Sequence, residues 1–221
     1  MSDDPAMERA ASRRAAALRR RGVIAAGHAG QPDRARAALA DPDPDVQVAA
    51  LGALARMQAL SVADIDQALG SPHEPVRRRA TDAALSVVGP GSRSVLYRRL
   101  TTALADPDAL TVVGAAWFLG ERRVAAAVPA LTKVAQSHED MRCREAAVAT
   151  LGAIGDTRGL PAVLDALKDK PTIRRRATVA LAGFDDPRVD PALRKSAEDR
   201  DWQVRQAADE LLDDETINRP R

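Results

Sequence analysis

Apolar residues recur along the chain at the spacing of one face of a helix. Between Cys143 and Asp156 this face is formed by positions i, i+4, i+7, i+8 and i+11, which are Cys143, Ala147, Thr150, Leu151 and Ile154. Gly155 and Asp156 then end the predicted helix. The same pattern returns several times, which indicates a repeat protein.

Predicted long and short helices alternate and are separated by turns. The first long helix covers about 6–26, and later ones open at Val46, Val76, Ile173 and Val204. Another predicted helix covers 93–104, and the helix after the turn at 106–108 ends at Leu119-Gly120. Prolines at the first helical turn mark later short helices, at Pro129, Pro161 and Pro191. The segments 41–45, 71–75 and 106–108 are turns, and 89–91 breaks a helix. No window shows the alternation of a strand, so we predict none.

The long helices align on their first buried residue, here called the anchor. The anchors are Leu18, Val46, Val76, Thr111, Cys143, Ile173 and Val204. Their successive spacings are 28, 30, 35, 32, 30 and 31 residues. Such a period is typical of stacked helix pairs, because one pair cannot bury its apolar face alone. We therefore predict an all-α, right-handed solenoid of about six to seven repeats.

Composition agrees with one extended repeat domain, predicted over 6–213, with a disordered tail at 1–5 and a polar tail at 214–221. Only 2% of residues are aromatic, so Ala, Leu and Val must form the core. Apolar runs of signal-peptide or membrane-span length are absent from the sequence, which predicts a cytoplasmic protein. The net charge of +2 gives no overall field for a nucleic acid.

The repeating unit resembles HEAT-like repeats of the phycobilisome-lyase type. It consists of an Asp turn, the sequence Val-Arg-x-x-Ala-x-x-Ala-Leu-Gly-x-x-Gly-Asp and a Pro-Ala-Leu helix, over roughly residues 10–213. The resemblance implies a solenoid whose second helix in each pair lines a concave surface. It does not imply one function, because such repeats serve lyases, scaffolds, hydroxylases and DNA-repair proteins.

An arginine follows many anchors, and an aspartate often precedes the helix. The arginines are Arg19, Arg77, Arg144, Arg174 and Arg205, and the aspartates are Asp41, Asp106, Asp169 and Asp199. We interpret them as a structural ladder, in which the turn aspartate accepts from helix N–H groups and pairs with an arginine between repeats.

A second set of arginines is predicted to point away from the core. Helical geometry turns the residue two positions after the anchor outward, and the next residue lies beside it. These positions hold Arg20, Arg78 and Arg175, joined by Arg21, Arg79 and Arg176. They form a basic concave stripe for a partner or a solvated surface. Trp117, together with Phe118, is a candidate anchor for a partner or packs between repeats.

Catalytic sites are not apparent in the sequence. The pairs His73-Glu74 and His138-Glu139 lie in turns, whereas di-iron HEAT-like hydroxylases carry His-Glu pairs inside the long helix, so we predict no metal site. Cys143 occupies a buried anchor position without a histidine to activate it. With one cysteine and no phosphate-binding loop, we predict no cofactor.

The leading hypothesis is a monomeric, non-enzymatic scaffold that binds another protein through its concave face. A second hypothesis is nucleic-acid binding through the arginine stripe, as in HEAT-like DNA-repair proteins; scarce aromatic residues and near-neutral charge weigh against it. A third, suggested by the repeat type alone, is a bilin lyase or a lyase-chaperone subunit.

Overall fold

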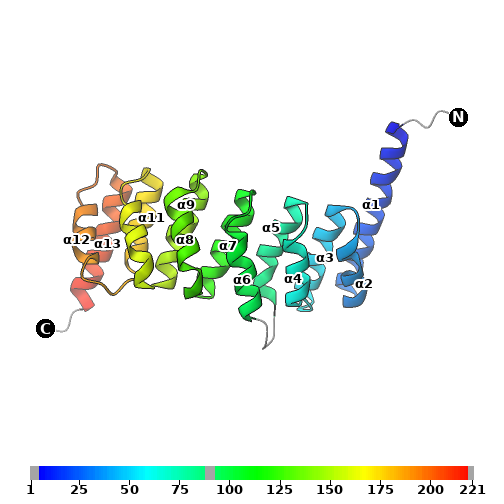
Figure 1. Ribbon diagram of the computed structural model, residues 1–221, viewed down its shortest axis with the longest axis horizontal. Helices are drawn as coiled ribbons and strands as arrows, with labels where there is room; N and C mark the ends of the chain where they lie inside the picture. Colours follow the sequence, from blue (N-terminus) through cyan, green and yellow to red (C-terminus); the bar gives the residue numbers. More distant parts are fainter. Residues whose placement is uncertain (1–4, 88–92, 219–221) are drawn as a thin grey trace. The chain divides into compact units, whose positions relative to one another are not determined.

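The computed structural model describes residues 5–87 and 93–218, where every regular element is a helix (Figure 1). The odd-numbered α-helices are α1 (Pro5–His28), α3 (Pro44–Arg56), α5 (Glu74–Ala83), α7 (Ala109–Glu121), α9 (Met141–Ile154), α11 (Pro171–Leu181) and α13 (Trp202–Asn218). The even-numbered ones are α2 (Pro32–Ala37), α4 (Val62–Leu69), α6 (Arg93–Ala103), α8 (Val128–Ser137), α10 (Leu160–Ala166) and α12 (Val189–Ser196). Short 3-10 helices cover Ala38–Ala40, Ala84–Ser86, Ala125–Ala127 and Thr157–Gly159. The predicted all-α repeat fold is confirmed.

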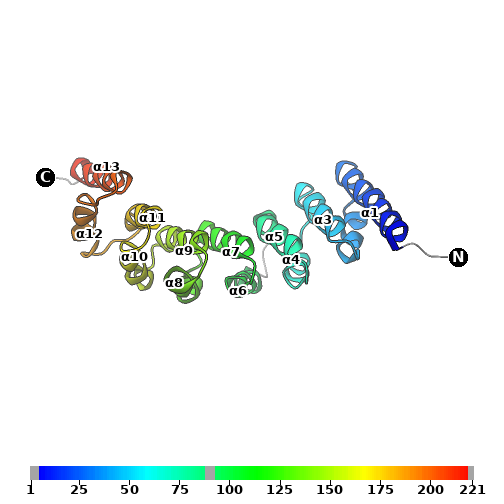
Figure 2. The same cartoon turned by 90° about the horizontal axis from the view of Figure 1, so that it is seen from above.

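The chain divides within α6 into two compact units, residues 1–99 (unit 1) and 100–221 (unit 2). In unit 1, α1, α3 and α5 pack side by side, with α2 and α4 against them (Figure 2). In unit 2, α7, α9, α11 and α13 form one layer, and α8, α10 and α12 pack against one side of this layer. We call the row of odd-numbered helices within each unit its odd-helix layer.

The predicted ends of the domain differ in detail from the helices. Helix α1 begins at Pro5, the last residue of the predicted tail, whereas residues 1–4 lie outside the described chain. Helix α13 continues to Asn218, within the predicted polar tail. The break at 89–91 lies outside the described residues. A single domain over 6–213 stays a prediction.

The anchor positions place the core where the pattern predicts it, with one exception. Val46, Val76, Thr111, Cys143, Ile173 and Val204 are all buried. Leu18 was predicted to be buried too, and this is wrong, because its side chain is 66% exposed. An anchor faces the preceding helix of the layer, as the Cys143 thiol shows by donating to the Ala109 carbonyl of α7. Helix α1 has no preceding helix within the described residues, so Leu18 has nothing to pack against.

Helices α9 and α11 approach closely because Gly152 carries no side chain. A Cβ atom on Gly152 would lie 2.7 Å from Ala180 Cα, closer than real Cβ contacts allow. Three residues later, Gly155 ends α9 in the left-handed conformation, with φ 72°. This is the helix end that the sequence predicts, and it is a conformation that glycine adopts without steric cost.

Arginine–aspartate pairs of the predicted ladder are formed in both units. Guanidinium-to-carboxylate distances are 2.7 Å for Arg19–Asp41, 2.9 Å for Arg144–Asp169 and 2.8 Å for Arg174–Asp199. In each case the arginine binds the turn before the next odd-numbered helix. Arg174 also donates to the Asp169 carbonyl in its own turn, at 3.0 Å. The ladder arginine therefore joins its own turn to the following one.

The prediction that the ladder aspartate also accepts helix N–H groups is wrong for Asp41 and Asp199, which accept from Asp43 and Asp201 in the turns. Other aspartates of the turns cap the helices. Asp43, Asp108 and Asp140 accept backbone N–H groups at the starts of α3, α7 and α9. Asp199 accepts from the Arg174 side chain as well as from the Asp201 backbone N–H, and the hydrogen bond from Arg174 lowers the pKa of its carboxyl group. Within the described residues, no helix is both long and apolar enough to span a bilayer.

Candidate partner-binding surfaces

Trp117 lies on α7, six residues after the anchor, with 51% of its surface exposed. The same repeat position holds Ala149 on α9 and Val179 on α11, and Val179 is 44% exposed. Because α7, α9 and α11 pack side by side, equivalent positions fall on the same face of the layer. We call Trp117, Ala149 and Val179 the apolar row.

A groove of about 310 Å³ lies between α9 and α11 beside the apolar row. Its lining residues are Ala149, Gly152, Ala153, Arg176, Val179, Ala180, Ala182 and Gly183. The groove exists because nearly all of these side chains are small, so the helices approach closely and leave no long side chains above the contact. Arg176 borders it with the only charged side chain among the lining residues described.

Phe118 does not belong to this surface. The sequence left two interpretations open for Phe118, contact with a partner or packing between repeats, and its 1% exposure agrees with the second. One residue along a helix turns the side chain by about 100°, from the outer face into the layer. The Arg122 guanidinium carbon lies 5.9 Å from the centre of the Phe118 ring.

The predicted arginines differ in what surrounds them. In unit 2, Arg175 is exposed and Arg176 donates to Glu145 of α9 at 3.2 Å. In unit 1, Arg20 is exposed and Arg78 pairs with Glu74 one turn earlier, at 3.1 Å. Because Arg20 and Arg78 belong to one unit and Arg175 to the other, their sharing of one concave face stays a prediction.

Arg79, another of the predicted arginines, extends from α5 to α3, the middle helix of unit 1's odd-helix layer. Its guanidinium reaches across α3, so that a Cβ on Gly52 would lie 3.2 Å from Arg79 Nη2. Arg56 of α3 reaches the same place, with Nη1 3.7 Å from that point. Sequence reasoning missed Arg56, because it stands at the end of its helix and outside the repeated arginine positions.

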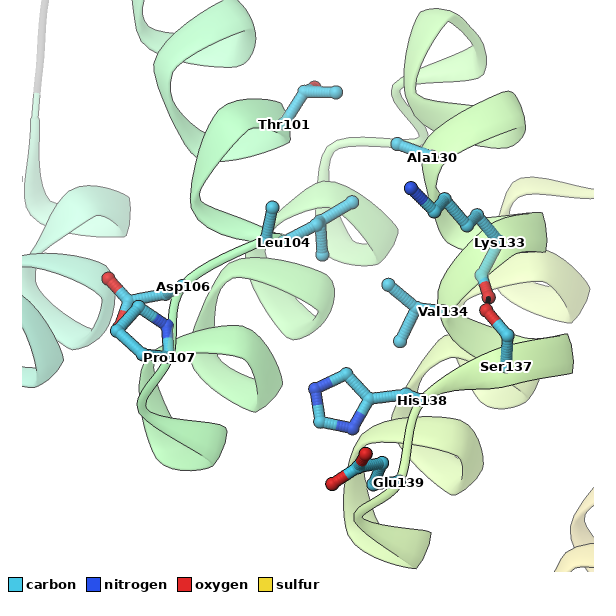
Figure 3. Close-up of a pocket in the computed structure, with 11 residues that line it drawn as sticks. Thr101, Leu104, Asp106, Pro107, Ala130, Lys133, Val134, Ser137, His138 and Glu139 are labelled. Atoms are coloured by element: carbon cyan, nitrogen blue, oxygen red, sulfur yellow. Dashed lines mark hydrogen bonds between the residues drawn. The ribbon is translucent and has the colours of Figure 1, made fainter.

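A second cavity, of about 420 Å³, lies between the end of α6 and α8 in unit 2 (Figure 3). Leu104 and Val134 supply its apolar lining, and Lys133, His138 and Glu139 stand around it. The Asp140 backbone N–H donates to His138 Nδ1 at 3.1 Å, so in a neutral ring the hydrogen sits on Nε2. The charges around the cavity have both signs, and they favour no particular ligand.

The remaining candidates for chemistry have structural surroundings. The Cys143 thiol is fully buried, and loss of solvent raises its pKa to about 11, so it is protonated at neutral pH. His73 lies in the turn before α5, and His138 follows the end of α8, as the sequence predicts. Across residues 5–87 and 93–218, no three His, Cys, Asp or Glu side chains are grouped to hold a metal ion.

Comparisons with known proteins agree with the repeat architecture. Residues 97–182 match the family of HEAT repeats. No curated protein sequence matches the chain. The structure is similar to the complex of CpcE and CpcF of phycocyanin lyase from Nostoc sp. PCC7120 (TM-score 0.58, 23% identity, covering 80% of this chain and 74% of that one). It is also similar to a designed armadillo repeat protein in complex with the peptide (KR)4 (TM-score 0.60, 16% identity, 82% and 98% covered).

Proposed function

We propose that this chain, a HEAT-like repeat protein, is a non-enzymatic scaffold that binds another protein through its odd-helix layers. The observation that carries the proposal is the apolar row of unit 2. Trp117 exposes half of a large, rigid side chain on a helix whose neighbours offer a groove of small residues. Tryptophan is among the residues that contribute most to protein interfaces. The groove between the next two helices of the layer, α9 and α11, gives an apolar side chain of the partner a place to bury.

The charge of the groove suggests how the partner is oriented. Arg176 and Glu145 form an ion pair at its edge, with side chains 43% and 27% exposed. A rim of opposite charges around an apolar centre is typical of protein interfaces, where the rim fixes register and the centre supplies affinity. We therefore expect a partner segment that places an aliphatic side chain between α9 and α11 and a polar group beside Arg176.

Two similar structures add support at the level of the fold. The designed armadillo repeat protein holds a charged peptide, and the phycocyanin lyase structure is a complex of two proteins. Stacked helix pairs present a long row of equivalent positions, which suits an extended partner.

The test compares two exposed tryptophans of unit 2. Trp117→Ala removes the centre of the proposed surface, and Trp202→Ala removes an indole that is 61% exposed at the start of α13. Each immobilised variant is exposed to lysate from cells that naturally produce the protein, and bound proteins are quantified by mass spectrometry. Proteins retained by the parent and by Trp202→Ala but lost with Trp117→Ala are then purified and titrated by calorimetry.

We expect Trp117→Ala to reduce the binding free energy of a purified partner by about 2 kcal/mol or more, the range of interface hot spots. Val179→Ser, on α11, should also weaken binding of the same partner. If Trp117→Ala and Trp202→Ala have the same capture profile and the same affinities, the apolar row is not the binding surface.

The two other hypotheses make different demands. Nucleic-acid binding requires affinity for duplex DNA with a steep salt dependence, and absence of binding at low salt would remove it. A bilin-lyase role, for which the similarity to the phycocyanin lyase complex is the support, requires that the chain promote bilin attachment to an acceptor protein. Mixing the chain with bilin and apo-phycocyanin and following absorbance tests this directly.

A further inference from the structure

Two arginines of unit 1 converge on the backbone of α3. Arg56 Nη1 and Arg79 Nη2 both lie within 3.7 Å of the point where a Cβ on Gly52 would stand. Arg56 also extends to α1, where its Nη2 lies 2.9 Å from the equivalent point on Gly27. The two glycines thus leave room for guanidinium groups to lie against the helices. Any larger residue at Gly52 would displace Arg79.

Neither guanidinium has an acidic partner in the part of the chain that the structure describes. Arg56 is exposed and Arg79 half-buried, and neither side chain forms an ion pair or hydrogen bond there. Two positive groups held this close repel each other, and the repulsion falls when an anion binds between them.

In unit 2, the arginine at the position of Arg79 is paired with a carboxylate. Arg176 occupies the position of Arg79, three residues after its anchor, and it binds Glu145 of the neighbouring helix α9. Glu145 stands two residues after its own anchor, and on α3 that position holds Val48. The carboxylate that satisfies the arginine within unit 2 is therefore replaced by an aliphatic side chain in unit 1.

We propose that Arg56 and Arg79, seated on Gly27 and Gly52, bind an Asp or Glu side chain of an acidic segment of a partner protein. The charge of unit 1 fits this partner: residues 1–99 contain 15 arginines and 11 acidic residues, whereas residues 100–221 contain 18 basic and 20 acidic residues. Half-buried Val48 supplies an apolar contact beside the carboxylate. This surface belongs to unit 1 and does not depend on the apolar row of unit 2.

An acidic protein segment suits the surface better than a nucleic acid. Helices α1, α3 and α5 carry no aromatic residue on which bases could stack. The arginine at the equivalent place in unit 2 is bound by a carboxylate, and its geometry is that of side-chain pairing across two helices. Arginine binds carboxylate groups through its paired N–H donors, and two arginines can hold one carboxylate from both sides.

Fluorescein-labelled peptide (Glu-Ala)4 is titrated with the full chain at low salt, and the fluorescence anisotropy of the peptide reports binding. Arg56→Ala/Arg79→Ala should weaken binding by about tenfold. The matched control Arg9→Ala/Arg13→Ala removes the same charge from exposed positions of α1 and should change binding by less than about threefold. Val48→Glu places a carboxylate at the position that Glu145 occupies in unit 2. It should weaken binding of the peptide because the new carboxylate competes for Arg79. Circular dichroism checks that each variant is folded.

Three results would overturn the proposal. The parent could fail to bind the peptide, the two double variants could weaken it equally, or Val48→Glu could leave the affinity unchanged. A fourth, tighter binding of octathymidylate than of the peptide with the same loss in Arg56→Ala/Arg79→Ala, would assign the arginines to a nucleic acid. Loss of this proposal would leave the Trp117 test intact, because the two concern different units and different variants.

Discussion

Arg174 is the most enclosed residue of the ladder, and its removal gives the sharpest test of how the repeats are joined. Its side chain is 6% exposed and that of Asp199 is 16% exposed. Two guanidinium nitrogens donate to the carboxylate, both at 2.8 Å, and a third contact reaches the Asp169 carbonyl at 3.0 Å. The pair joins the turn before α11 to the turn before α13.

Arg174→Ala is expected to destabilise unit 2 because it leaves the Asp199 carboxylate without its ion-pair partner. Removing one partner of a buried ion pair costs about 3–5 kcal/mol, since the other charge stays desolvated. Asp199 keeps its bond from the Asp201 backbone N–H and some solvent, which reduces this penalty. We therefore expect Arg174→Ala to lower the free energy of unfolding of unit 2 by about 2–3 kcal/mol.

Urea unfolding followed by tryptophan fluorescence measures this quantity, because both tryptophans, Trp117 and Trp202, lie in unit 2. A double-mutant cycle with Asp199→Ala isolates the coupling between the two side chains. The more exposed pair Arg144–Asp169, at 17% and 24%, should couple by only about 1 kcal/mol. Equal coupling energies for both pairs, or none for Arg174, would refute the argument from burial.

Other predictions concern the core and the turns. Leu151→Ala should cost about 2–5 kcal/mol by urea unfolding, because Leu151 is fully buried. Gly152→Ala should lower the free energy of unfolding by about 1–3 kcal/mol, because the added methyl group pushes α9 away from α11. The Cys143 thiol should react with a disulfide reagent at pH 8 only after denaturant is added, since its pKa is raised to about 11. The lowered pKa of Asp199 gives stability that is present above about pH 4 and lost as pH falls through the folded-state value, so Asp199→Asn should flatten acid unfolding.

Much of the fold follows from local pattern, because each repeat carries its own period, turn and anchor. Cys143 and Ile173 are buried, as expected of the first residue on the apolar face of each long helix. The Arg–Asp ladder follows from charged residues that recur at fixed positions in the repeats. Leu18 shows the limit, since the pattern assigns it a face but does not say whether another helix packs there, and within the described residues none does.

The two surfaces proposed to bind a partner were only partly predictable. The exposure of Trp117 follows from helical geometry, whereas the groove between α9 and α11 depends on how closely Gly152 lets these two helices approach. The convergence of Arg56 and Arg79 requires knowing that residues 23 positions apart meet over one glycine. Such meetings depend on the packing of neighbouring repeats, which a single period in sequence does not specify.

The most direct test of the central claim is photocrosslinking from chosen positions in producing cells. A photoreactive amino acid is placed at Trp117 on the odd-helix layer of unit 2 and, in a control, at exposed Pro161 on α10 in the opposite layer. The account predicts that position 117 gives discrete adducts with another protein and that position 161 gives none of them. Adducts at both positions alike, or at 161 alone, would contradict it.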